Sequence, residues 1–122
     1  MSVPIVSIGI KHTEIWYPVE AFVDSGATYS IFTAEVARTI GLEYEGGRKI
    51  FVQVGDGGLI PAYLHDLTIQ LGSEKFVAPL GFSGRLGVGF NLLGRNGIFD
   101  RFKVCFDEKN SVVTFQNHEM AL

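Results

Sequence analysis

The sequence predicts one mostly β domain that spans residues 1–122. A chain of 122 residues can build one hydrophobic core but not two. Several runs alternate apolar and polar residues with the period of a strand, residues 66–71 most clearly, and glycine-rich turns separate them. Asp56-Gly57 joins two such runs, and Asp-Gly is a strong hairpin signal because both turn positions need positive φ. Together these observations predict hairpins around one core.

The first two strands are expected over residues 3–10 and 15–24. The first is β-branched and apolar, and Pro4 near its start is tolerated at a sheet edge. The second places Tyr17 and the other odd-numbered residues on one face, with Glu20 on the solvated face. Seven further runs are expected as strands: residues 50–54, 59–64, 66–71, 75–80, 92–93, 103–107 and 111–116.

Two short helices are expected among the strands. Over residues 33–42, Thr33 can cap the first turn and Gly41 can adopt the left-handed conformation that ends a helix. A second helix is expected over residues 98–102, with Asn96 as its cap. The helix over residues 33–42 is interpreted as scaffold.

The composition bounds the partners and the compartment. Hydrophobic residues make up 47% of the chain and charged residues 19%, which predicts apolar surface left over for a homo-oligomer. The net charge of -3, without a Lys/Arg cluster, argues against nucleic acid and anionic membranes as partners. The single Cys105 cannot form an intramolecular disulfide, and residues 1–4 lack the pattern of a signal peptide. We therefore expect a cytoplasmic protein.

The sequence lacks the motifs of several common kinds of catalytic site. The three histidines and Cys105 show no metal-ligand spacing. Residues 87–89 lack the third glycine of a dinucleotide fingerprint, and residues 81–85 lack the last glycine of a nucleophile elbow. The sequence therefore predicts no metal and no other cofactor.

An apolar run, residues 21–23, ends at Asp24, and the following residues predict a tight turn. Residues 21–23 are apolar and predict a buried strand end, where the charge of Asp24 needs a partner or a hydrogen bond. Gly26 lets the backbone turn back toward that acid, and Ser25 adds a hydroxyl. An Asp-x-Gly sequence is also an ordinary turn that needs no function. Asp24 is nevertheless the candidate catalytic residue.

A second apolar run, residues 90–93, leads into Gly94, Arg95 and Asn96. The Asp-Ser-Gly-Ala motif at residues 24–27, followed at this distance by Gly-Arg-Asn, resembles the retropepsins, which are the retroviral-type aspartic proteases and their cellular relatives. The resemblance extends over about residues 3–115. It implies a closed or partly open β-barrel with one or two short helices, assembled as a two-fold homodimer.

The resemblance also implies roles for individual residues. Asp24 would be the catalytic acid. The residues that would support it are Ser25, Gly26 and Ala27. A flap formed by the hairpin over residues 48–65 would close over substrate, and the substrate-binding residues at its tip would be Gly55, Asp56, Gly57 and Gly58. The structural motif would be Gly94, Arg95 and Asn96, and the hairpin over residues 103–116 is the candidate dimer interface.

One acid per chain implies two chains. Peptide hydrolysis without a metal or a nucleophile requires one group to accept a proton from water and another to donate one to the carbonyl oxygen. Asp24 alone cannot do both, whereas a two-fold axis places it opposite its own copy. The sequence thus predicts an aspartic endopeptidase with an Asp24/Asp24 dyad and a protein or peptide substrate.

Viral members of the family commonly carry an acid directly after Asp-Thr/Ser-Gly-Ala, which can pair with the arginine of Gly-Arg-Asn. This chain has Thr28 at that position, so Arg95 must find another partner. The candidates are Asp66 and Asp100. Two other functions stay open. One is a non-catalytic peptide-binding or dimerisation module with the same fold. The other is a β-barrel with an unrelated ligand and an accidental motif.

Overall fold

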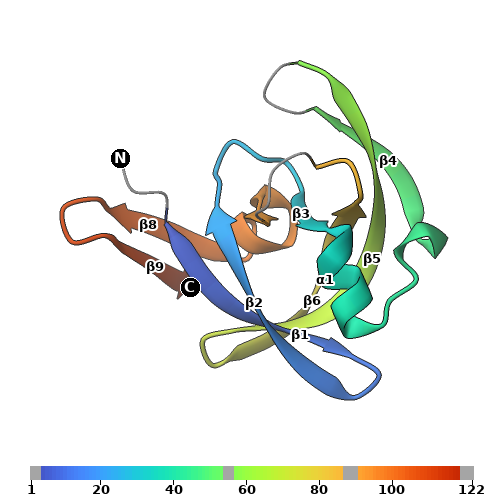
Figure 1. Ribbon diagram of the computed structural model, residues 1–122. Coiled ribbons are helices and arrows are strands. Elements are labelled where there is room, and N and C mark those ends of the chain that lie inside the picture. The colour runs from blue at the N-terminus through green and yellow to red at the C-terminus, as the bar shows by residue number, and fades with distance from the viewer. Residues whose placement is uncertain (1–3, 54–56, 87–90, 119–122) are drawn as a thin grey trace.

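The computed structural model describes residues 4–53, 57–86 and 91–118. Strands account for most of them, which confirms the mostly β class (Figure 1). The elements in chain order are β1 (Ile5–His12), β2 (Ile15–Val23), β3 (Ser30–Thr33), α1 (Ala34–Ile40), the 3₁₀ turn η1 (Tyr44–Gly46), β4 (Arg48–Gln53), β5 (Leu59–Leu71), β6 (Glu74–Ser83), β7 (Leu92–Leu93), the helical turn η2 (Arg95–Phe99), β8 (Phe102–Asp107) and β9 (Val112–Asn117).

The main sheet closes on itself as an uneven ring. Its strand order is β1-β2-β7-β3-β6-β5-β4, and β1 also pairs with β5. Most neighbours are antiparallel, but β7 runs parallel to β2 and β3 runs parallel to β6. The two-residue β7 therefore lies between β2 and β3, at the point where the chain leaves β2. This crossing positions the candidate site.

The core fills the inside of the ring. Phe32 and Phe82 are fully buried, with ring centroids 5.8 Å apart. Strand β2 points Ala21 and Val23 inward and leaves Glu20 exposed, as its alternation predicts. Burying side chains of this size is the main favourable term in folding, at about 25 cal/mol for each Å² of apolar surface.

Helix α1 forms as its end signals predict. The Thr33 hydroxyl accepts a hydrogen bond from the Val36 N–H at 3.4 Å, and Gly41 ends the helix at φ 77°. Its buried face carries Ala34, Ala37 and Ile40. No helix in the part of the chain that the structure describes is long and apolar enough to cross a membrane.

Two expected elements differ from the structure. The helix expected over residues 98–102 is wrong, because the turn η2 lies earlier, Asn96 and Gly97 inside it are not helical, and Phe102 begins β8. The two strands expected over residues 59–64 and 66–71 are one strand, β5. It stays continuous because its first half pairs with β4 and most of it pairs with β6.

The C-terminal hairpin forms a sheet of its own from β8 and β9. Phe102 at its base packs against Phe76 and Phe115, with ring centroids 5.4 and 6.0 Å apart. Farther along, Phe106 and Val112 are exposed. The apolar face that was expected to need a partner is thus covered at its base by the chain's own core.

Candidate active site

Asp24 directly follows the last residue of β2, where three strands meet. Its backbone N–H donates to the Leu93 carbonyl at 2.9 Å, one residue beyond the parallel pairing of Val23 with Leu93. The N–H of Val23 donates to the Pro4 carbonyl at 3.0 Å on the other side. The backbone at Asp24 is therefore fixed from both edges, and its side chain is half-buried.

The turn after Asp24 is the tight one that its sequence predicts. The Gly26 N–H donates to Oδ1 of Asp24 at 2.9 Å, and the Ala27 N–H donates to the Asp24 carbonyl at 3.2 Å. A Cβ on Gly26 would lie 3.3 Å from that same Oδ1, a tight approach. Ser25 and Gly26 are exposed. The turn thus holds one carboxylate oxygen by a backbone donor and presents the acid at the surface.

The second motif is locked onto this turn by backbone hydrogen bonds. The Arg95 N–H donates to the Ala27 carbonyl and the Asn96 N–H donates to the Thr28 carbonyl, both at 2.9 Å. The structure therefore brings together the two motifs that lie far apart in the sequence. Because the bonds are made by main-chain atoms, they fix the position of the turn whatever its side chains do.

Gly94 is the point of closest approach between the two motifs. A Cβ there would overlap the Tyr29 carbonyl oxygen and lie 2.8 Å from the Ala27 oxygen. Its N–H donates to the hydroxyl of the fully buried Ser30 at 2.9 Å. Only glycine lets the two chain segments come this close. Ser30 is a site residue that the motif search missed.

Arg95 finds its partner in the residue that replaces the viral acid. Its Nη2 donates to Oγ1 of Thr28 at 3.2 Å on the exposed side of the turn. Neither candidate carboxylate bonds to the Arg95 guanidinium within the described residues. The Asp100 carboxylate accepts instead from the Gly97 N–H at 3.1 Å, and Asp66 lies in β5. The side-chain hydrogen bond between the two motifs is thus made here by a neutral hydroxyl group.

Asn91 is a second residue that sequence reasoning missed. Its amide Oδ1 accepts from the Thr33 N–H at 3.0 Å and its Nδ2 donates to the Glu20 carbonyl at 2.9 Å. Its own carbonyl accepts from the Phe22 N–H at 2.8 Å. Asn91 therefore ties β2 to the start of α1. The signal in the sequence that could have identified it is a polar amide directly before the two apolar residues of β7.

A hairpin of β4 and β5, with Gln53 paired to Leu59, lies where the flap was predicted. In Figure 1 the ends of these strands reach up on the same side of the view as the turn after β2. Gly57 and Gly58 are exposed, and Gly57 has φ 88°. The other two predicted flap residues, Gly55 and Asp56, lie outside the described residues.

The described residues supply one acid to this site, Asp24. In the part of the chain that the structure describes, no other carboxyl group hydrogen bonds to Asp24, and no three His, Cys, Asp or Glu side chains gather as metal ligands do. One carboxylate oxygen is held by Gly26, and no hydrogen bond within the described residues engages the other. The arrangement can present a carboxyl group to water or to a second acid.

The chain is similar to known proteins in sequence and in fold. The sequence model of the aspartyl protease family matches residues 11–80, which include the Asp24 turn. Among solved structures, the EIAV protease complexed with the inhibitor HBY-793 matches with a TM-score of 0.60 and 20% identity, over 77% of this chain and 83% of that chain. A comparison with curated protein sequences gave no match.

The ring of strands is similar in fold to that retroviral protease. The family match covers more than half of the chain. This chain therefore belongs to the aspartyl protease family.

Proposed function

We propose that the protein is an aspartic endopeptidase whose active site is completed by a second copy of the chain. The observation that supports the proposal most is the position of Asp24 and the hydrogen bond that its carboxyl group accepts. Its carboxyl group is held by the Gly26 N–H at 2.9 Å on an exposed turn, inside the segment that matches the aspartyl protease family, and the motif resemblance implies that Asp24 is the catalytic acid. Asp24 supplies half of the machinery that peptide hydrolysis requires.

A second Asp24 supplies the other half. In a two-fold dimer the same surface of both chains meets at the axis, so an exposed turn near that axis faces its own copy. One carboxylate then accepts a proton from the attacking water, while the other, protonated, donates a hydrogen bond to the scissile carbonyl. After water has added to the carbonyl, the roles reverse and the leaving nitrogen is protonated.

The substrate is proposed to bind as an extended segment between the Asp24 turn and the β4–β5 hairpin. Main-chain hydrogen bonds give affinity in such a mode, and alternate side chains enter apolar pockets. Phe51 and Leu59, on the two strands of the hairpin, are 61% and 66% exposed, so apolar surface is available there. A protein or peptide with apolar side chains around the scissile bond fits this surface.

The dyad predicts a bell-shaped pH profile with a mildly acidic optimum. Two ionised carboxylates about 3 Å apart repel by roughly 5 kcal/mol at an effective dielectric constant of about 20, or about four pK units between the two proton losses. Aspartic protease dyads share one proton for this reason. Activity requires that single shared proton, so the rate of hydrolysis should fall on both sides of the optimum.

The decisive experiment compares the wild type with Asp24→Asn on an unfolded protein mixture. We expect the substitution to reduce hydrolysis by roughly 10³ because it removes a proton acceptor. Asp66→Asn is the matched control, since Asp66 is exposed on β5. Both variants should keep the far-UV circular dichroism of the wild type. Identical fragments from the wild type and Asp24→Asn would contradict the proposal and favour a peptide-binding module.

Mixing subunits tests the dimer separately from the acid. Inactive Asp24→Asn chains are exchanged in equal amount with wild-type chains, and hydrolysis is measured per wild-type chain. Random pairing leaves about half of the wild-type chains in intact dyads, so the activity per wild-type chain should fall to about half. Unchanged activity per wild-type chain would show that one chain acts alone.

A further inference from the structure

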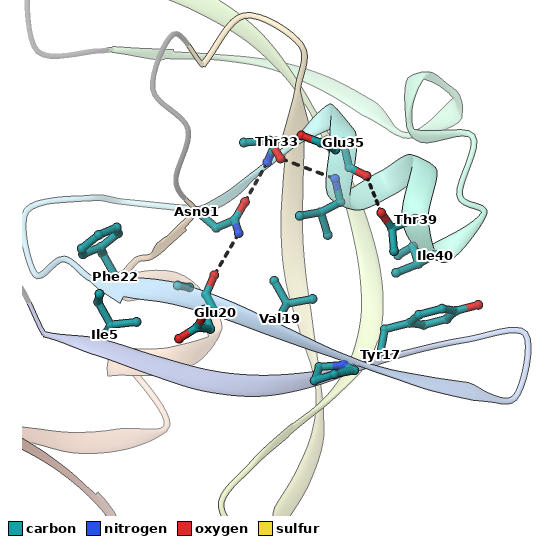
Figure 2. A pocket seen from close by; sticks show the side chains of 13 residues that line it. Ile5, Tyr17, Val19, Glu20, Phe22, Thr33, Glu35, Thr39, Ile40 and Asn91 are labelled. Carbon is teal, nitrogen blue, oxygen red and sulfur yellow. Dashed lines mark hydrogen bonds between the residues drawn. The ribbon is translucent and has the colours of Figure 1, made fainter.

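A groove separate from the Asp24 turn runs between β2 and α1. Its volume is about 690 Å³, within the range of roughly 300–1,000 Å³ that is usual for ligand sites. Tyr17 and Val19 line it from β2, and Val36 and Ile40 line it from α1. Figure 2 shows Val19 directed from the strand toward the helix. Asp24 does not belong to its lining.

The floor of this groove carries an open strand edge. Strand β2 pairs with β1 along its whole length, but on its other edge β7 pairs only with Phe22 and Val23. No strand among the described residues covers the remainder of that edge, residues 15–21. Unpaired strand edges readily accept another strand, so this edge is a template for an extended chain.

The alternation of β2 identifies the backbone groups on the open edge. The N–H of Val23 points to the β1 side, where it donates to Pro4, and the N–H of Phe22 points to the other side, where it donates to Asn91. In a strand these directions alternate, so the even-numbered residues present their N–H and C=O groups to the open edge. Trp16 and Pro18 therefore face it, together with the N–H of Glu20.

One end of the edge is closed by Asn91. Its side-chain amide donates to the Glu20 carbonyl and accepts from the Thr33 N–H, which the dashed lines in Figure 2 mark. The bridge links the strand to the start of α1 across this end of the groove. A strand added to β2 would stop at this bridge, which defines the length of the site.

The charge of the groove favours a basic occupant. Glu20 and Glu35 lie on its two walls, and no Lys, Arg or His is among the described residues that line it. Its remaining lining is apolar or neutral. An occupant that alternates apolar and basic side chains would place the first kind between Val19 and Val36 and the second on the opposite face of the sheet, beside Glu20.

We propose that this groove is a peptide-binding site, distinct from the Asp24 turn, that takes an extended basic and apolar segment as an added strand on β2. The segment accepts hydrogen bonds from the Trp16 and Glu20 N–H groups and donates to the Pro18 and Trp16 carbonyls. Pro18 has no N–H, so the segment lacks one hydrogen bond there. The occupant is a protein segment of this chemistry, and its binding does not depend on hydrolysis at Asp24.

Fluorescence anisotropy with a labelled Val-Lys-Val-Arg-Val peptide tests the site on the full chain. We expect saturable binding, and at least tenfold weaker binding of the peptide Val-Glu-Val-Glu-Val. Glu20→Gln should weaken binding of the basic peptide by about threefold, and this loss should diminish at high salt. Equal affinity for the two peptides would overturn the charge argument.

Blocking the groove separates this site from other surfaces. Thr39 lines the groove and is exposed on α1, so Thr39→Arg should weaken peptide binding at least tenfold by bulk and charge. Thr114→Arg places the same side chain on an exposed position of β9 and should leave affinity unchanged. Asp24→Asn and an excess of a statine-type inhibitor should also leave it unchanged. Displacement by the inhibitor would assign the peptide to the Asp24 site instead.

Backbone methylation tests the strand mode itself. Two versions of the peptide carry N-methyl groups on alternate residues, one version on the odd and the other on the even positions. Because only alternate N–H groups can face β2, one version should lose binding and the other should keep it. Equal binding of both versions would overturn strand addition. A change in sedimentation caused by Thr39→Arg would show that a second copy of the chain occupies the groove.

Discussion

The Asp24 turn and the β8–β9 hairpin are attached to the core in different ways. Main-chain hydrogen bonds hold the turn, from Asp24 to Leu93, from Arg95 to Ala27 and from Asn96 to Thr28. No backbone ladder joins the hairpin to the main sheet within the described residues. The hairpin attaches through side chains, with the Phe102 ring packed between Phe76 and Phe115.

This difference in attachment determines which residue types each region tolerates. Backbone hydrogen bonds bring the two segments at the turn so close together that no space is left for a Cβ at Gly94. Aromatic packing specifies volume and apolarity, which several residue types supply. A site that must present a carboxyl group in one orientation uses the first kind of attachment, and a supporting hairpin can use the second.

The largest effect is expected from Gly94→Ala. The added methyl group meets the Tyr29 and Ala27 carbonyl oxygens, and neither can move without breaking the contact between the two motifs. We expect a loss of about 4 kcal/mol in the free energy of unfolding, or failure to fold. Denaturant unfolding of the purified variant measures it.

Gly46→Ala is the matched control, because a Cβ at Gly46 meets no atom within 4 Å. Its free energy of unfolding should change by no more than about 1 kcal/mol. A Gly94→Ala variant as stable as Gly46→Ala would show that the two motifs tolerate separation, and the contrast with the hairpin would disappear.

The second effect is expected at the base of the hairpin. Phe102 is 3% exposed, and Phe102→Ala should cost about 3 kcal/mol through lost burial and a cavity. Phe106 is 43% exposed on the same strand, so Phe106→Ala should cost less than about 1 kcal/mol. Denaturant unfolding compares the two variants. Equal losses would contradict the assignment of the hairpin's attachment to its base.

Hydrogen exchange tests whether the turn and the hairpin open separately. In Phe102→Ala the amide protons of β8 and β9 should lose protection first, because the hairpin loses its anchor. The N–H groups of Asp24 and Arg95 should stay protected by their carbonyl partners. Simultaneous loss of protection in both regions would show that the turn and the hairpin open as one unit.

Local signals were enough to predict parts of this structure. Thr33 and Gly41 mark the two ends of α1, and each acts through atoms within one turn of itself. The Asp24 turn follows in the same way from an acid, a small residue and a glycine. That this turn meets Gly94 came from the resemblance to a family, because no local rule brings residues so far apart together.

Contacts between distant residues account for what was missed. Asn91 and Thr33 are separated by 58 positions, and their hydrogen bond depends on β7 lying between β2 and β3. The pairing of β1 with β5 closes the ring and has no signature in either strand. The two-fold partner of Asp24, the cytoplasmic location and the flap's closure over substrate stay predictions.

The smallest effect is expected where this chain departs from viral members of its family. Thr28→Asp places a carboxylate beside Arg95, whose Nη2 lies 3.2 Å from the Thr28 hydroxyl oxygen. The pair is exposed, so the free energy of unfolding should rise by only about 0.5 kcal/mol at low ionic strength. The gain should vanish at high salt, which screens exposed charges, and also below about pH 4, where the carboxylate becomes protonated. Thr28→Asn has the same shape without the charge and should show no gain. If Thr28→Asn were stabilised equally, shape rather than charge would account for the gain.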